Sequence, residues 1–258
     1  MKKRLLGIIV LIIIAQLNSF SQNRESKFNL NVDFSNRHTW RGGLTLGTAC
    51  IKPSIEYNVN NFKIGAWGLY ALDTSYDEVD IYIGYNIGNF SFMAYDFYMP
   101  SAGYKNSNFS DYSQKTGLHM FDFTASYTFS GEYPLTIMGA ATYYEPEANM
   151  NEESIAKQGE LSKLSTYLEL SYPTKIAGKN LSWTLGMAPG KSRYSRLFLD
   201  NGDKLYSQNA FYIVNMGLNI SDKIKITDKF SLPISAGLTY NPHQDKLYLQ
   251  VNISLNNN

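Results

Sequence analysis

The strongest constraint on the fold is an alternation of apolar and polar residues that runs from Glu78 to Pro100. Its first half places Val79, Ile81, Ile83, Tyr85 and Ile87 on one face and Glu78, Asp80, Tyr82, Gly84 and Asn86 on the other. A period of two is typical of a β-strand with one apolar and one wet face. Gly88 and Asn89 then form a tight turn of the kind that joins antiparallel strands. The stretch therefore predicts a β-hairpin.

The same alternation recurs along the rest of the chain. Its apolar positions hold mainly Leu, Ile, Val, Phe and Tyr, and the positions between them hold mainly Ser, Thr, Asn and Gly. Together with the first hairpin it predicts twelve strands, at 28–35, 54–59, 62–70, 78–87, 90–100, 121–129, 135–143, 164–172, 181–187, 212–220, 230–239 and 247–255. An even number of strands, each joined to the next, indicates an all-β, antiparallel, up-and-down architecture.

Alternation alone does not separate a barrel in lipid from a soluble β-barrel or sandwich, because each buries one face. The segments have the roughly ten-residue length that a tilted strand needs to cross a bilayer, and their apolar face is almost free of charge. The three longest connections, 100–117, 145–161 and 188–210, all follow odd-numbered strands. Short periplasmic turns and longer extracellular loops are typical of outer-membrane barrels. We therefore predict a transmembrane β-barrel over residues 22–258.

The N-terminus has the pattern of a secretory signal peptide. Lys2, Lys3 and Arg4 precede an apolar run from Leu5 to Ala15, and small residues follow at Ser19 and Ser21. The apolar run is much shorter than the roughly 20 residues of a membrane-spanning helix. We expect a signal peptide over residues 1–21, cut before Gln22, and export to the outer membrane of a Gram-negative cell.

Composition argues against several functional classes. The chain has 23 Lys and Arg and 22 acidic residues. Cleavage of the signal peptide would remove Lys2, Lys3 and Arg4 and leave 20 basic residues. There is therefore no basic excess that would favour binding of nucleic acid. Cys50 is the only cysteine, which rules out an intrachain disulfide. The histidines, His38, His119 and His243, are scattered, and no Cys or His pair stands at ligand spacing. We expect no metal site, no cofactor and no enzymatic activity.

Two residues conflict with their strands. Pro53 cannot donate to a neighbouring strand, and a closed barrel has no edge to accommodate it. We expect either that the second strand starts near Ser54 or that it contains a bulge. Asp96 would face lipid near mid-depth, where a carboxylate is costly. A bulge near Tyr95 would turn its side chain inward.

The inward charges concentrate on the first four strands and their rims. The candidate lumen-lining residues are Asp33, Arg37, Arg41, Glu56, Lys63, Trp67, Glu78, Asp80 and Glu169, and Lys52 and Asp122 add to the inward charge. One interpretation is an ion-pair lattice that braces the lumen. The other is a charged strip facing the neutral wall of the last strands, which would orient a polar solute. Trp67 is either a stacking surface for a sugar or base, or a side chain that fills the lumen.

Arg41 is the inward residue with the clearest expected role. It follows Trp40, which can anchor at the outer interface, and precedes Gly42 and Gly43, where the chain can turn sharply. An unpaired guanidinium in a confined lumen would be costly. We expect it to form a forked pair with one of the carboxylates nearby, Asp33, Glu56, Glu78 or Asp80.

Several short motifs resemble one known family. They are Trp40-Arg41-Gly42, Pro53-Ser54-Ile55-Glu56, Gly65-Ala66-Trp67-Gly68, Glu78-Val79-Asp80-Ile81-Tyr82 and Tyr95-Asp96-Phe97-Tyr98. The chain in this part is similar to the Gcw_chp family of uncharacterised bacterial outer-membrane proteins, also labelled porins of the TorF type. The resemblance covers most of the first 130 residues and implies an outer-membrane β-barrel with a porin label, without catalytic residues to carry over.

The sequence leaves two functions open. The interior of an eight-stranded barrel is filled by its own side chains, whereas a sixteen-stranded barrel leaves a water channel. The lumen of a twelve-stranded barrel lies between these two cases in width. The first hypothesis is a narrow porin-like channel for small polar solutes. The alternative is a closed structural or adhesion-type barrel whose extracellular loops bind a partner. Outer-membrane lipid is the expected surrounding, and neither hypothesis specifies the oligomeric state.

Overall fold

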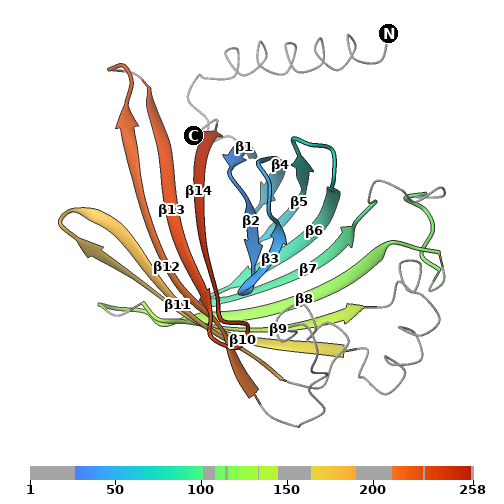
Figure 1. Ribbon diagram of the computed structural model, residues 1–258. Helices are drawn as coiled ribbons and strands as arrows, with labels where there is room; N and C mark the ends of the chain where they lie inside the picture. Colours follow the sequence, from blue (N-terminus) through green and yellow to red (C-terminus); the bar gives the residue numbers. More distant parts are fainter. Residues whose placement is uncertain are drawn as a thin grey trace.

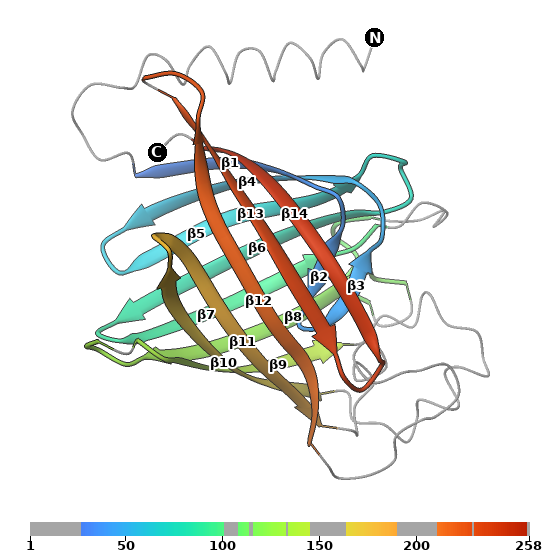
Figure 2. The same cartoon turned by 60° about the vertical axis from the view of Figure 1, so that its left-hand side comes forward.

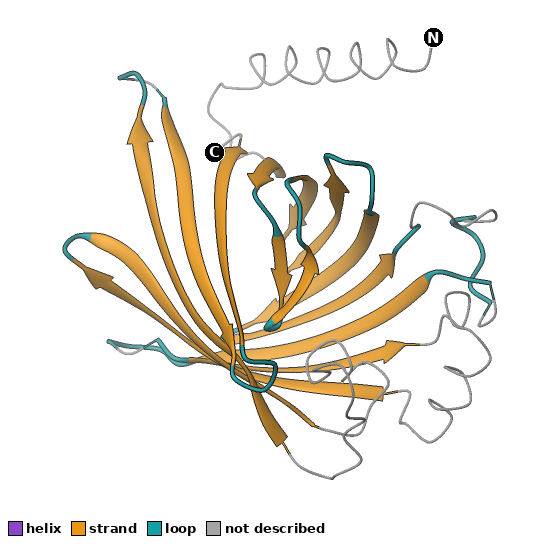
Figure 3. Ribbon diagram, in the orientation of Figure 1, coloured by secondary structure: helices purple, strands orange, loops and turns teal. Residues whose placement is uncertain are grey.

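The computed structural model describes residues 27–100, 108–113, 116–132, 134–144, 164–189, 211–228 and 230–256. The predicted signal peptide at 1–21, the loop at 145–161, and parts of the loops at 100–117 and 188–210 lie outside these residues. Every regular element of the described residues is a β-strand (Figure 3). None of those residues belongs to a helix long and apolar enough to span a membrane.

Twelve strands close into one antiparallel barrel (Figures 1 and 2). In chain order they are β1 (Phe28–Ser35), β4 (Cys50–Val59), β5 (Phe62–Ala71), β6 (Asp77–Ile87), β7 (Phe90–Tyr98), β8 (His119–Thr128), β9 (Thr136–Tyr144), β10 (Leu164–Ile176), β11 (Lys179–Pro189), β12 (Phe211–Lys225), β13 (Ser231–Asn241) and β14 (Lys246–Asn256). Each pairs with the next barrel strand along the chain, and β14 pairs with β1 to close the ring. The predicted twelve-stranded barrel is confirmed.

The two faces of the wall differ in polarity. Large apolar side chains remain exposed on the outward face, for example Phe34, Ile64, Ile83, Phe123 and Leu249. Charged side chains are buried on the inward face, among them Lys52, Glu78, Asp80 and Asp122. Water would penalise so extended an apolar exterior, whereas lipid stabilises it. The wall therefore has the polarity of a membrane-spanning barrel.

Tight turns connect β4 to β5 and β6 to β7, as predicted. Asn60 and Gly88 both have positive φ, of 52° and 56°, which suits the turns that follow the twist of paired strands. Ala177 and Gly178 make the same kind of connection between β10 and β11. These turns lie at the end of the barrel opposite the β1–β4 connection, because neighbouring strands run antiparallel.

The expectation for Pro53 was wrong on both counts. β4 begins at Cys50 and runs through Pro53, which pairs with Val32 on β1. On the other side, the pairing with β5 breaks at Lys52 and Pro53 and resumes in the same register, with Ile51 opposite Tyr70 and Ser54 opposite Trp67. The missing proline N–H therefore interrupts one ladder locally, without a bulge.

The expected bulge near Tyr95 is also absent. The β6–β7 pairing is continuous through Tyr82 with Tyr95 and Ile81 with Asp96. Asp96 stays on the outward face, close to the end of β7 at Tyr98 rather than at mid-depth. Its carboxylate accepts hydrogen bonds from Tyr112 Oη at 3.0 Å and pairs with His119 Nδ1 at 2.7 Å. Polar partners outside the wall thus replace the predicted inward turn.

The segment from Arg37 to Gly47, which lies between the first two predicted strands, contains the two remaining strands. β2 (His38–Trp40) and β3 (Gly43–Leu46) form an antiparallel two-stranded sheet. This luminal hairpin, residues 38–46, extends from the end of β1 into the interior of the barrel (Figures 1 and 2). It occupies part of the lumen.

Candidate functional site

The tip of the luminal hairpin abuts the inner wall at β12. Arg41 and Gly42 form its turn, with φ of 47° and 86°. A Cβ atom at Gly42 would lie 1.9 Å from the Val214 carbonyl oxygen, so only glycine permits this approach of two backbones. Asn241 Nδ2 also donates to the Gly42 carbonyl at 3.2 Å. The sequence placed a sharp turn at Gly42 and Gly43, one residue after the turn that the structure shows.

Further contacts hold both strands of the luminal hairpin. The Thr39 backbone N–H donates to Gln250 Oε1 on β14 at 2.9 Å, and the Thr39 hydroxyl lies 3.1 Å from the same oxygen. Leu46 packs in a buried apolar cluster with Cys50, Leu69 and Ala71. Trp40 packs against a second cluster, formed by Ala140, Tyr167, Ala188 and Val214. The hairpin is therefore fixed to the wall through hydrogen bonds and apolar packing on several sides.

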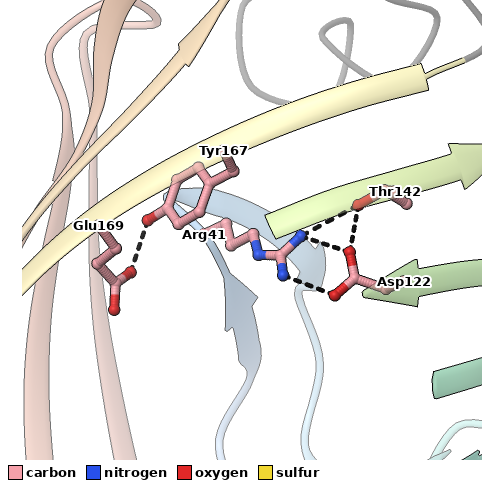
Figure 4. Close-up of polar contacts among 5 residues, drawn as sticks. All are labelled: Arg41, Asp122, Thr142, Tyr167 and Glu169. Atoms are coloured by element: carbon pink, nitrogen blue, oxygen red, sulfur yellow. Dashed lines mark hydrogen bonds and ion pairs between the residues drawn. The ribbon is translucent and has the colours of Figure 1, made fainter. Parts of the chain in front are cut away.

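Arg41 reaches from the hairpin to the opposite wall, where it forms a forked pair with Asp122 on β8 (Figure 4). Nη1 and Nη2 donate to the two Asp122 carboxylate oxygens, each at 2.8 Å. Nη1 also donates to Thr142 Oγ1 at 3.1 Å, and the Thr142 hydroxyl donates to Asp122. The side chains of Arg41 and Asp122 are only 7% and 1% exposed. The predicted forked pair exists, but its expected partners, Asp33, Glu56, Glu78 and Asp80, were wrong.

Two aromatic rings flank the guanidinium. Its central carbon lies 4.4 Å from the centroid of the Trp40 ring and 5.1 Å from that of Tyr167. The Tyr167 hydroxyl donates to Glu169 Oε2 at 2.6 Å (Figure 4). It also accepts from Asn215 Nδ2 at 3.0 Å. Contacts of this kind stabilise a cation that is removed from water. The charge of Arg41 is thereby held at a fixed point of the lumen.

A cavity of about 610 Å³ lies between the luminal hairpin and the wall formed by β4 to β10. We call it the luminal cavity. Seven of the nine predicted lumen residues line it, namely Arg41, Glu56, Lys63, Trp67, Glu78, Asp80 and Glu169. Asp33 and Arg37 are not among the lining residues, and Asp33 instead accepts a hydrogen bond from Ser254 Oγ at 2.6 Å. Carboxylates and aromatic rings dominate this lining.

The wall on the other side of the luminal hairpin, toward β11 to β14, is neutral, as predicted for the last strands. A smaller cavity of about 170 Å³ lies toward β11 to β14 and is lined by uncharged polar groups, including Asn215, Asn219, Gln250 and Asn252. The predicted charged strip facing a neutral wall is thus present in the arrangement of side chains. Part of the ion-pair lattice is present too, because Arg41 and Asp122 brace the luminal hairpin.

Hydrogen bonds fix most of the carboxylates that line the luminal cavity. Glu56 accepts from Asn58 Nδ2 at 3.0 Å and from the Tyr82 hydroxyl at 3.1 Å. Glu78 accepts from the Tyr76 hydroxyl at 2.7 Å. In the described part of the chain, no three His, Cys, Asp or Glu side chains are placed to hold a metal ion. The cavity therefore offers fixed negative and aromatic groups without a metal-binding constellation among those residues.

Sequence reasoning missed the elements that position Arg41. Thr142 and Tyr167 alternate with apolar residues like many other inward positions, so nothing in their spacing marked them as neighbours of Arg41. Asp122 was noted as an inward charge but was assigned no partner. The contacts depend on a hairpin that crosses the lumen, and strand phase alone does not show such a crossing.

No protein-family model matches the chain, and no curated protein sequence matches it. Among solved structures, OprD of Pseudomonas aeruginosa is similar at 10% identity, over 91% of this chain and 68% of OprD, with a TM-score of 0.35. Wzi of Escherichia coli, an outer-membrane carbohydrate-binding β-barrel involved in group 1 capsule assembly, is similar at 10% identity, over 87% of this chain and 54% of Wzi, with a TM-score of 0.34. At such low identity and TM-score these likenesses carry no argument about function.

Proposed function

We propose that this chain is an outer-membrane barrel that forms a narrow channel for small polar solutes, with the luminal hairpin as its constriction. The observation that carries the proposal is the polar lumen on both sides of the hairpin. Cavities of about 610 and 170 Å³ remain there, the larger lined by charged, aromatic and methionine side chains and the smaller mainly by uncharged polar groups. A barrel that served only as a scaffold would be expected to fill this space with packed side chains.

The outer-membrane location rests on physical features of the chain. The apolar outward face requires lipid, and strands spanning a membrane occur as closed barrels because every backbone polar group must be paired. The basic and apolar N-terminal segment supports export through a signal peptide. The resemblance of its motifs to the Gcw_chp family supports the same location.

The contacts of the luminal hairpin favour a second candidate function. Arg41 spans the lumen, and apolar clusters hold Leu46 and Trp40. If these contacts never open, the barrel is closed and its extracellular loops carry the function by binding a partner. The two candidates differ in one property, which is the passage of ions and solutes through the lumen.

Conductance in planar lipid bilayers distinguishes the two candidates. The purified, folded protein should give discrete single-channel openings, with a small conductance because the hairpin narrows the lumen. Boiled protein from the same preparation is the control for contaminating porins and detergent. Absence of openings at high protein load would contradict the channel and favour the closed barrel.

A further inference from the structure

No ion pair among the described residues joins a basic side chain to either of two carboxylates that line the luminal cavity, Glu78 and Asp80. Glu78 and Asp80 lie two residues apart on β6, so their side chains share the inward face. They are 8% and 6% exposed. Within the described ranges, the ion pairs of basic side chains involve other carboxylates, such as Asp122 with Arg41. Neighbouring buried carboxylates without a counter-ion are costly when both are ionised.

Three buried polar atoms that line the luminal cavity have no hydrogen-bond partner among the described residues. They are Asp80 Oδ1, His38 Nδ1 and Thr45 Oγ1. Buried polar groups are almost always paired in folded proteins. Atoms from β6, β2 and β3 thus converge on one space, which is the expected arrangement for groups that bind something within it.

Aromatic rings complete the surroundings of Asp80. Trp67 lies directly opposite Asp80 in the pairing of β5 with β6. The His38 and Trp67 rings are 5.4 Å apart between centroids, and the Tyr82 and Tyr95 rings are 5.5 Å apart. All four of these rings line the cavity. The faces of indole and phenol rings attract cations, and carboxylates accept hydrogen bonds from ammonium groups.

We propose that the luminal cavity binds the protonated amino group of a small organic amine, with Asp80 and Glu78 as its acceptors and Trp67 as its aromatic wall. This inference rests on the proposed channel function and names the class of solute that the channel favours. A divalent metal ion fits less well, because it prefers several oxygen ligands and the described residues offer no such set. Arg41 and Lys63 also line the cavity. Next to Glu78 and Asp80, however, an anion would be repelled.

The test is calorimetric titration of the full, folded protein in detergent with cadaverine. The neutral analogue 1,5-pentanediol has the same length and should not bind. Asp80→Asn should weaken cadaverine binding about tenfold or more, because it removes a charged acceptor while keeping nearly the same shape. The matched control is Asp33→Asn, which removes an inward carboxylate that does not line the cavity and should bind as the wild type does.

The outcomes separate this inference from the channel itself. Binding of cadaverine that is lost in Asp80→Asn and kept in Asp33→Asn supports the site, whether or not the barrel conducts. Equal affinity for cadaverine and 1,5-pentanediol, equal weakening in both variants, or no binding overturns it. If Glu78 and Asp80 instead share a proton with each other, they need no cation, and cadaverine should not bind. Single-channel openings without cadaverine binding would leave the channel standing and remove the amine site.

Discussion

Arg41, at the tip of the luminal hairpin, and Asp122, on β8, form a forked ion pair whose two N–O distances are both 2.8 Å. The residues are far apart in sequence, and their pairing joins the hairpin to the opposite wall of the barrel. Both side chains are almost completely buried. The pair therefore links the stability of the protein to the position of the luminal hairpin.

Arg41→Ala should lower stability by about 3–5 kcal/mol, because it leaves the Asp122 carboxylate buried without its counter-ion. Arg41→Lys should restore only part of the loss, since Lys lacks the planar fork. Urea unfolding in detergent, followed by tryptophan fluorescence, measures the difference. The matched control is Lys225→Ala, which breaks a largely exposed pair with Asp228 and should cost less than about 1 kcal/mol.

The double variant Arg41→Ala/Asp122→Ala gives a sharper test of the same pair. It should be more stable than Arg41→Ala alone, because no unpaired buried charge remains. If Arg41→Ala unfolds like the wild type and also conducts like it, Arg41 braces neither the barrel nor the constriction.

Gly42→Ala should displace the luminal hairpin from β12. The Cβ of the new alanine would lie 1.9 Å from the Val214 carbonyl oxygen, a backbone atom that cannot rotate away. We expect proteolysis within residues 38–46 on the folded barrel, detected by mass spectrometry, where the wild type is resistant.

Gly178→Ala separates this clash from backbone strain. Gly178 has a similar φ of 78°, but a Cβ there meets nothing within 4 Å. This variant should lower the free energy of unfolding by only about 1 kcal/mol. It should leave the luminal hairpin resistant to protease. Equal behaviour of the Gly42 and Gly178 variants would argue against close contact between hairpin and wall.

The loops should lie on opposite sides of the membrane according to their length. A cysteine introduced at Ser75, between β5 and β6, should react with an impermeant maleimide on intact cells, and one at Asn89, between β6 and β7, should not. The native Cys50 is 1% exposed, so the wild type serves as the unlabelled control. Labelling at Asn89 but not at Ser75 would mean that the barrel has the opposite orientation.

His119→Ala should lower the free energy of unfolding by about 1–3 kcal/mol. The reason is that the outward-facing Asp96 then loses one of its two hydrogen-bonding partners. Asp96→Asn in the same background should recover part of the loss, because a neutral amide tolerates apolar surroundings better than a carboxylate. Urea unfolding of the two variants side by side is the measurement. A His119→Ala variant as stable as the wild type would show that the pair contributes nothing.

The strand architecture was accessible from sequence because a membrane barrel repeats one physical rule along every strand. Alternation located all twelve strands, and the two-residue gaps at 60–61 and 88–89 marked tight turns. The rule does not extend to exceptions whose partners come from elsewhere in the fold. Pro53 is accommodated by a local gap in one ladder. Asp96 stays outward because Tyr112 and His119 pair with it there.

The candidate site could be predicted in its residues but not in its geometry. Most inward charges named from sequence do line one cavity. The partner of Arg41 could not be predicted from strand phase, because residues 38–46 leave the wall and carry Arg41 across the lumen. A sharp turn at Gly42-Gly43 was predicted from the sequence. The direction of the hairpin, in contrast, depends on packing of Leu46 and Trp40 against the wall.

The most direct test of the account compares single-channel conductance with and without the luminal hairpin. Residues 38–46 are replaced by a short glycine–serine linker, and folding is checked by the shift in gel mobility on boiling. The account predicts small, discrete openings for the wild type and a clearly larger conductance for the folded variant. Equal conductance of the two folded proteins would contradict it, because the hairpin would then not be the constriction.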